Sequence, residues 1–191
     1  PDVELDFSRE EYTTRLAKVR SAMESKDIDV LVSADPSNMS WLTGYDGWSF
    51  YTPQAVLVTH DDDPIWWGRG MDAKGALRTV YMDERHVIAY SDDHVMSTEK
   101  HAYQHLAALL SDSRFGQSVI GVELDNYYYS AASHIHLDEG VKEAKQPVES
   151  PKPFGIPLVR YKYIHGTCMC IAYAMLFGAG DTVSPYSRLL I

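Results

Sequence analysis

The 191-residue sequence is poor in cysteine and in positive charge. Its two cysteines, Cys168 and Cys170, are separated by one residue, so a disulfide between them would be strained. This excludes a disulfide framework and indicates a reducing, cytoplasmic environment. Lys and Arg number 17 against 27 Asp and Glu, and the formal net charge is -10. That balance argues against nucleic-acid binding, which needs clustered basic side chains.

Long apolar runs are also missing. Residues 1–7 carry acidic side chains and no apolar run, so we expect no signal peptide. The most apolar stretch, residues 164–180, is interrupted by a histidine and several glycines. It falls short of the roughly 18 continuous apolar residues that a membrane helix needs. We therefore expect a soluble cytoplasmic protein with no membrane partner.

Helix-like and strand-like patterns alternate along the chain as far as residue 137. Ser8 and Glu11 form a capping box ahead of a helix that we expect to end near Lys26. Apolar, β-branched runs predict strands at 28–34, 55–59, 65–67, 86–90 and 119–124. Further helical patterns lie at 35–44, 72–77, 97–110 and 126–137. The alternation, with one hairpin, predicts an α/β fold: a mixed, mostly parallel sheet of about six strands flanked by helices on both faces.

The composition changes after about Gly140. Four prolines, at positions 147, 151, 153 and 157, fall within eleven residues, which is typical of a linker. The sequence thus predicts a domain at 1–145, a proline-rich linker at 146–157 and a tail at 158–191. The tail is apolar and aromatic without a clear period, and we assign it no role.

Aromatic side chains are densest between Asp35 and Tyr51. Rings beside glycine turns can bind a small cation through cation–π attraction, and the nearby Arg69 could hold a carboxylate by two parallel hydrogen bonds. The alternative is that these rings only fill a core or a subunit interface, where Trp and Tyr are equally typical. The two interpretations coincide if a subunit interface forms the wall of a pocket. The candidates are Trp41, Tyr45, Trp48, Phe50, Tyr51, Thr52, Trp67 and Arg69.

The segment from Phe7 to about Leu137 resembles the amino-terminal domain of the creatinase, prolidase and proline-specific aminopeptidase superfamily. The matching stretches are FSREEY at 7–12, DPSNMSWLTGYDGWSFY at 35–51, WWGRGMD at 66–72, GALRT at 75–79 and GVELDNYY at 121–128. The NxxWLTGY core is shared loosely across the superfamily. The DGWSFY and WWGRG continuations are narrower and point to its ectoine-hydrolase branch.

The resemblance implies a parent enzyme that hydrolyses a C–N bond outside peptides, by opening the ring of ectoine. It places the reacting groups in a carboxyl-terminal domain of pita-bread shape, for which the tail is too short. The amino-terminal domain would support dimerisation and contribute side chains near Phe50 and Thr52 to the neighbouring subunit's pocket. Creatinase has an arginine at the second position, so the threonine departs from that pattern. We therefore expect no catalytic residue, metal or cofactor in this chain, which would act on a small molecule only together with the catalytic domain.

Two other functions fit the same residues. The parent could be a proline-specific aminopeptidase or prolidase, or the chain could be a stand-alone small-molecule binding or interaction module. Whether the chain is part of an enzyme is left open at this point.

The remaining polar clusters are interpreted as structural. His101 and His105 have the spacing of two metal ligands on one helix face, but no glutamate follows His101, so we expect surface histidines. Glu123 and Asp125 end a strand, and we interpret them as structural, not as an acid/base pair. Gly68-Arg69-Gly70 lacks the third glycine of a dinucleotide-binding loop.

Overall fold

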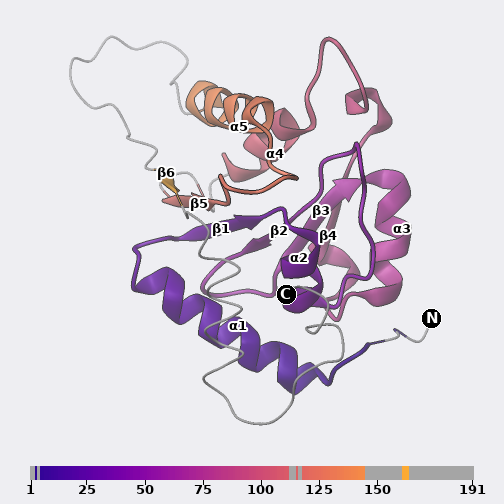
Figure 1. Ribbon diagram of the computed structural model, residues 1–191, viewed down its shortest axis with the longest axis vertical. Helices are drawn as coiled ribbons and strands as arrows, with labels where there is room; N and C mark the ends of the chain where they lie inside the picture. Colours follow the sequence, from indigo (N-terminus) through magenta and orange to yellow (C-terminus); the bar gives the residue numbers. More distant parts are fainter. Residues whose placement is uncertain (1–2, 4, 112–114, 116–117, 145–160, 164–191) are drawn as a thin grey trace.

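The computed structural model describes residues 3, 5–111, 115, 118–144 and 161–163 (Figure 1). The five α-helices of this part are α1 (Arg9–Glu24), α2 (Pro36–Thr43), α3 (Gly70–Thr79), α4 (Ala102–Leu110) and α5 (Ala131–Ala144). The six strands are β1 (Val30–Ser33), β2 (Ala55–Val58), β3 (Ile65–Arg69), β4 (Val87–Tyr90), β5 (Ile120–Val122) and β6 (Tyr161–Tyr163). Two short 3-10 turns, η1 (Glu84–His86) and η2 (Asp92–His94), flank β4.

The strands form one sheet in the order β4-β3-β2-β1-β5-β6. β2 is antiparallel to both of its neighbours, and the other three pairings are parallel. This confirms the prediction of a mixed, mostly parallel α/β sheet. β6 comes from the tail to which the sequence assigned no role. The expected linker, 146–157, and the rest of the tail lie outside the described residues.

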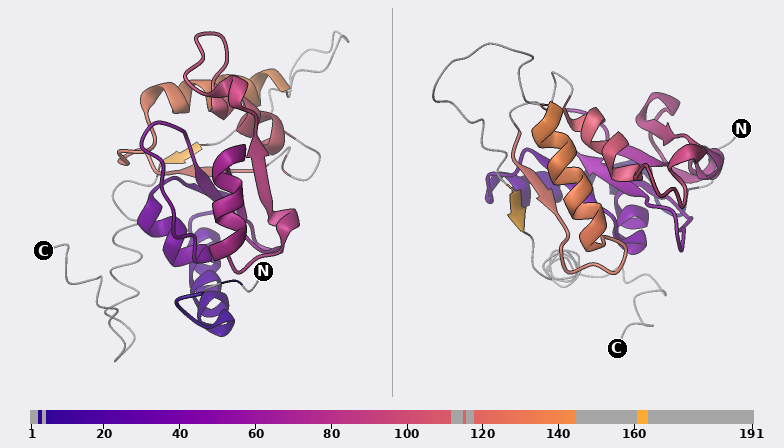
Figure 2. Two further views of the ribbon diagram at one scale, coloured as in Figure 1. Left: turned by 90° about the vertical axis from the view of Figure 1, so that its right-hand side faces the viewer. Right: turned by 90° about the horizontal axis from the view of Figure 1, so that it is seen from above.

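Helices cover both faces of the sheet and create two separate cores. α4 and α5 pack against each other over one face, while α1, α2 and α3 cover the other (Figures 1 and 2). Successive residues of a strand point to opposite faces. Accordingly, Trp67 is buried beneath α4 and α5, and the adjacent Trp66 is buried among α1, α2 and α3. The tryptophan pair thus anchors both layers to β3.

The first two helices lie where the sequence predicted, except that α1 ends at Glu24 and not near Lys26. Ser8 caps α1 by accepting the N–H of Glu11 at 3.2 Å. α2 ends at Gly44, whose φ of +82° lies in the left-handed region that favours glycine. A Cβ at this position would also lie 2.8 Å from the carbonyl oxygen of Thr79, so the chain after α2 passes close to the end of α3.

The prediction that a helix begins at Ser97 is wrong. α4 starts at Ala102 because the His101 side chain accepts the N–H of Tyr103 at 3.2 Å and so caps the helix. The Ser97 hydroxyl instead closes an earlier turn by accepting the N–H of Lys100 at 3.1 Å. His101 therefore lies at a helix end, not on a helix face shared with His105.

The last helix is also displaced from its expected range of 126–137, since α5 spans Ala131–Ala144. Asn126 cannot open a helix because its side chain serves a turn: its Oδ1 accepts the N–H of Tyr128 at 2.8 Å, and its Nδ2 donates to Glu123 at 2.7 Å. The start of α5 is instead marked by Ser130, whose Oγ accepts the N–H of Ser133 at 3.1 Å.

Glu123, the residue after β5, is a buried carboxylate that joins β1, β5 and α2. Its two oxygens accept five hydrogen bonds, from Ser33 Oγ (2.9 Å), Asn38 Nδ2 (2.9 Å), Ala34 N (2.8 Å), Asp35 N (3.1 Å) and Asn126 Nδ2 (2.7 Å). Each donor is satisfied by an oxygen that also binds another segment, so the carboxylate fixes the loops that follow β1 and β5. Its role is structural, as predicted, while Asp125 is exposed.

Candidate functional site

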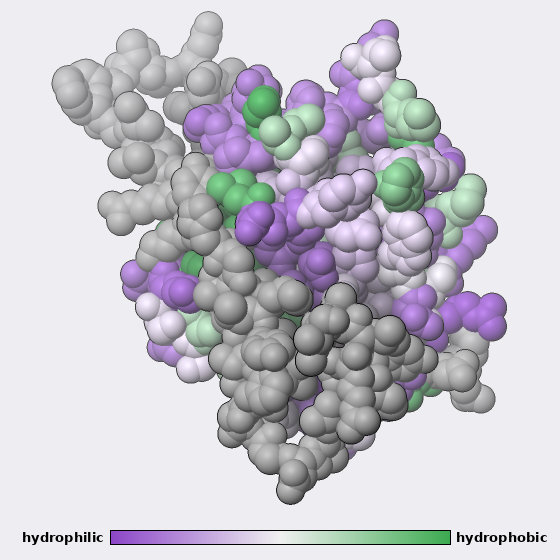
Figure 3. Space-filling model, in the orientation of Figure 1, coloured by the Kyte–Doolittle hydropathy of each residue, from purple (hydrophilic) through white to green (hydrophobic). Residues whose placement is uncertain are grey.

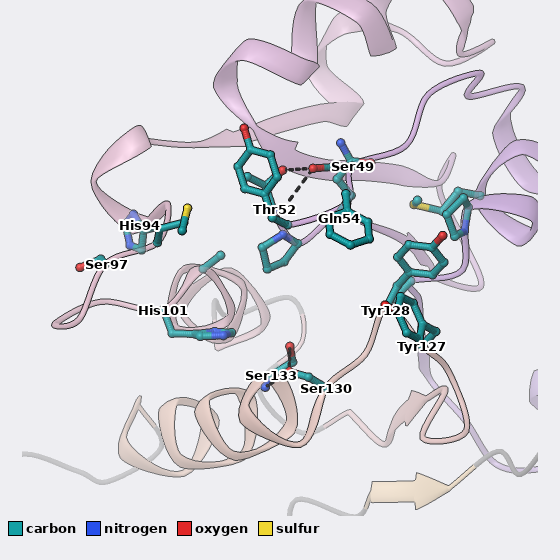
Figure 4. Close-up of a pocket in the computed structure, with 18 of the residues that line it drawn as sticks. Ser49, Thr52, Gln54, His94, Ser97, His101, Tyr127, Tyr128, Ser130 and Ser133 are labelled. Atoms are coloured by element: carbon teal, nitrogen blue, oxygen red, sulfur yellow. Dashed lines mark hydrogen bonds between the residues drawn. The ribbon is translucent and has the colours of Figure 1, made fainter.

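A cleft of about 300 Å³ opens at the edge of the sheet where the parallel strands end (Figure 4). It lies between the start of α2, the loop 49–54, the segment 94–102 and the segment 127–133. After β1 the chain builds β2 to β4 on one side, and β5 then returns to the other side of β1. In open α/β sheets, ligands bind at such a point of reversal, beyond the carboxyl ends of the strands. The topology alone therefore makes this cleft a candidate site.

The loop between α2 and β2, residues 45–54, forms one wall of the cleft and is called the aromatic loop. Trp48, Phe50 and Tyr51 on this loop have exposed fractions of 60%, 70% and 61%. The rings of Trp48 and Phe50 meet edge to face with centroids 6.2 Å apart. Side chains of intermediate hydropathy gather right of centre in Figure 3, where Figure 1 draws this loop. Large rings so exposed are typical of a contact surface.

Buried polar side chains hold the base of the aromatic loop. Thr52 is buried and its hydroxyl is hydrogen bonded to Ser49, while Asp72 of α3 accepts from Gln54 Nε2 at 2.9 Å and from Thr52 Oγ1 at 3.3 Å. The Tyr45 hydroxyl donates to Gln54 Oε1 at 3.3 Å. Burial, and then the nearby Asp72 carboxylate, raise the pKa of Tyr45 to about 12, so the phenol stays protonated. Thr52 thus anchors the loop.

The structure does not bring the eight candidate residues together. Tyr45 and Trp67 are core residues on opposite faces of the sheet, and the Trp67 indole N–H donates to His105 Nδ1 at 3.1 Å. Trp41 is half-buried against the core of α1, where the Arg15 guanidinium lies 5.3 Å from its ring centroid. These three rings are explained by packing. Only the exposed rings of the aromatic loop share a surface.

Arg69 already has a carboxylate partner. Its Nε and an Nη each donate to Asp92, at 2.8 Å and 2.8 Å, in the parallel geometry that the sequence analysis expected for a ligand. The pair joins the end of β3 to the turn that follows β4. A ligand carboxylate would have to displace Asp92, so the arrangement favours a structural role for Arg69.

Histidines gather beside the cleft, which the sequence did not predict. The His101 and His136 rings stack with centroids 4.5 Å apart, and those of His94 and His105 lie 6.1 Å apart. Burial, with the charge of neighbouring histidines, lowers the pKa of His101 and of His105. Within the part of the chain that the structure describes, no group of three or more His, Cys, Asp or Glu side chains is arranged to hold a metal ion.

Several cleft residues escaped the sequence analysis, notably Lys100, Ser130 and Ser133. Their position could have indicated them, because each lies in a segment that follows a strand whose carboxyl end reaches this edge of the sheet.

In the described residues, no helix is long and apolar enough to span a membrane.

The sequence model of the creatinase/prolidase N-terminal domain family matches residues 15–150. This chain belongs to that family. The resemblance seen in the sequence motifs is therefore confirmed.

Two curated relatives are similar to this chain. Ectoine hydrolase of Halomonas elongata is 52% identical over 133 residues, which are 69% of this chain and 33% of that protein. An uncharacterized hydrolase/peptidase of Sinorhizobium fredii is 41% identical over 138 residues, which are 72% of this chain and 35% of that protein. The chain thus spans about a third of the length of the curated relatives it matches.

Solved structures of this creatinase/prolidase family have the same fold. A proline dipeptidase of Streptococcus pneumoniae matches with a TM-score of 0.55 and 18% identity, over 84% of this chain and 97% of that one. An Xaa-Pro dipeptidase of Bacillus anthracis matches with a TM-score of 0.58 and 11% identity, over 84% of this chain and 35% of that one. At these identities the likeness shows the fold alone.

Proposed function

We propose that this chain is the non-catalytic amino-terminal domain of an ectoine-hydrolase-like enzyme, which opens the ring of ectoine by hydrolysing a C–N bond. The single observation that carries the proposal is the 52% identity over 133 residues to ectoine hydrolase. By contrast, the solved dipeptidases above are 18% and 11% identical to this chain. The reacting groups belong to a carboxyl-terminal domain, and this chain holds no cofactor.

In this proposal the enzyme is a homodimer, and the aromatic loop enters the neighbouring subunit's pocket. Trp48, Phe50 and Tyr51 are exposed, so their faces are available to a planar cation such as a protonated amidine. Burying these rings against a partner also removes their apolar surface from water. The anchor formed by Thr52, Gln54 and Asp72 holds the loop in place before the partner binds. A cytoplasmic location and the absence of nucleic-acid partners belong to the same proposal.

A chimera tests the proposal. Residues 1–144 would replace the matching amino-terminal third of Halomonas elongata ectoine hydrolase, and ring opening of ectoine would be measured beside cleavage of Xaa-proline dipeptides. We expect activity on ectoine alone. Trp48→Ala with Phe50→Ala should lower kcat/KM at least about tenfold, since a desolvated cation–π contact contributes about 2 kcal/mol. Ile135→Ala is the matched control, because Ile135 is comparably exposed (51%) but lies on α5.

Mixed dimers test the contribution across the interface. One subunit would carry the altered aromatic loop and the other a disabled catalytic domain. Because the intact loop then faces the intact catalytic domain at one of the two sites, activity should reappear on mixing. If each altered protein stays inactive after exchange of subunits, the loop does not act on the neighbouring subunit.

A prolidase or proline-specific aminopeptidase domain is the second candidate, favoured by the fold shared with proline dipeptidases. Cleavage of Xaa-proline dipeptides by the full-length parent, without ring opening of ectoine, would support it. A stand-alone binding module is the third candidate, and a parent reading frame that ends at Ile191 would support it.

A further inference from the structure

The cleft is free of carboxylates in an otherwise acidic protein. None of the described residues that line it is Asp or Glu, although the chain has 27 of these against 17 Lys and Arg. Its wall instead contains Lys100, His94 and His101. Lys100 is ion-paired with Asp93, which lies outside the lining, so its charge is balanced from outside the cleft. An anionic ligand in the cleft would therefore meet no acidic side chain of the lining that repels it.

Two side chains that line the cleft have N–H groups available to a ligand. Lys100 has three N–H groups and donates one to Asp93, which lies outside the cleft lining. Nδ1 of His101 accepts the Tyr103 amide, so the neutral ring carries its proton on Nε2. Figure 4 shows the His101 ring reaching from the start of α4 toward Ser130 and Ser133. A ligand oxygen in the cleft would therefore meet donors from the segment 94–102.

The opposite side of the cleft adds a hydroxyl donor. Ser130 Oγ and Ser133 Oγ lie 3.0 Å apart and share one hydrogen bond, and Ser130 Oγ also accepts the N–H of Ser133. Two hydroxyls with one bond between them leave one O–H group for a ligand. By contrast, Gln54 is bonded through both its oxygen and its nitrogen, so it contributes only to the wall.

The remaining lining is apolar and aromatic, with Phe50, Tyr51 and Met96 exposed around the cleft. A volume of about 300 Å³ is at the lower end of the range for small-molecule sites, so the cleft suits a molecule of metabolite size. Donors on two facing segments and rings on a third fit a ligand with an anionic end and a flat or apolar body.

We propose that this cleft binds a small organic carboxylate, with its oxygens on Lys100, His101 and the Ser130–Ser133 pair and its body against Phe50 and Tyr51. The site is complete within this chain and requires no catalytic domain. It goes beyond the proposed function, with which it shares Phe50 and Tyr51, and its test uses this chain without a catalytic domain, so the two can fail separately.

The test uses the full 191-residue chain, labelled with ¹⁵N, and follows backbone amide shifts during titration. Benzoate is the probe, and benzamide, which has the same shape without the charge, is its matched control. We expect saturable benzoate shifts confined to residues 49–54, 94–102 and 127–134, and at least about tenfold weaker binding of benzamide. Lys100→Gln should weaken benzoate about tenfold. Lys142→Gln, at an exposed lysine paired with Asp138 on α5, should leave the affinity unchanged.

Three outcomes would overturn the proposal. Equal binding of benzoate and benzamide would show an apolar surface without anion recognition. Inorganic phosphate binding as tightly as benzoate would show a general anion site. Unchanged benzoate affinity in Lys100→Gln, with a spectrum that shows the variant is folded, would show that the donors named here do not hold the ligand.

Discussion

Replacing Glu123 by Gln tests whether one buried carboxylate holds the carboxyl edge of the sheet together. The substitution keeps the shape of the side chain and removes its charge. Of its neighbours, the Ser33 hydroxyl and the Asn38 amide can reverse their hydrogen bonds and accept from the new NH₂ group. The backbone N–H groups of Ala34 and Asp35 cannot reverse, so the remaining oxygen must face them. The number of hydrogen bonds is therefore preserved. We expect the free energy of unfolding to fall by the part that the charge of the carboxylate adds to these bonds.

The size of the expected loss of stability follows from these five hydrogen bonds. A hydrogen bond to a charged group contributes about 1.5–3 kcal/mol and one between neutral groups about 1 kcal/mol. Five bonds on one group are not additive, and a neutral amide costs less to bury than a carboxylate, so we expect a net loss of about 2–3 kcal/mol. For a chain of this length, that lowers the Tm by roughly 5–10 °C. Glu123→Ala, which leaves the donors without an acceptor, should cost at least about 4 kcal/mol.

Urea denaturation and thermal melting, followed by circular dichroism, would measure both variants. Asp125→Asn is the control, because it removes the same charge from an exposed side chain two residues away. We expect the control to stay within about 0.5 kcal/mol of the original protein. If Glu123→Gln is as stable as the control, the carboxylate contributes no more than a neutral acceptor. That result would refute the claim that its charge holds the carboxyl edge of the sheet together.

Two further predictions concern helix packing and pH. Gly140→Ala should destabilise the protein by about 1–3 kcal/mol, because its Cβ would lie 2.6 Å from the Cβ of Ala107. Gly75→Ala, in α3 with open space around it, should stabilise the protein by about 0.5–1 kcal/mol. Equal denaturation midpoints of the two variants would contradict both predictions. Burial lowers the pKa of His101 and of His105, so below pH 6.5 the unfolded state binds protons that the folded state does not, and stability falls as the pH falls. Histidine NMR titration checks the direction, and pKa values at or above 6.5 would contradict it.

The fold could be predicted because local patterns and the overall arrangement agree. Helix and strand alternate, Ser8 caps α1, and Gly44 ends α2 at the expected residue. β6 could not be predicted, since three residues in a stretch without a clear period give no signal of pairing. The start of α4 was misplaced because two residues compete to cap it. The sequence does not show that His101 caps α4 and that Ser97 closes a separate turn.

The candidate site was predicted only in part, and Trp67 shows why. The alternation of a strand requires Trp66 and Trp67 to face opposite ways, so both can be buried when helices cover both faces. Counting aromatic residues along the chain overlooks this. The exposed rings of the aromatic loop were found, because glycines and aromatics are adjacent in sequence. The cleft itself was missed, since Lys100 and Ser130 come from segments that only the folded sheet brings together.

The pairing of β1 with β5 sets the order in which a ribosome can complete this domain. Val30 pairs with Ile120, so the central strand keeps one edge open while ninety further residues are synthesised. During that interval a strand that is buried along its whole length in the finished protein presents unpaired backbone groups to other nascent chains. Among the described strand pairs this interval is the longest, so the edge of Val30–Ser33 is the one that stays open for most of the synthesis of the domain.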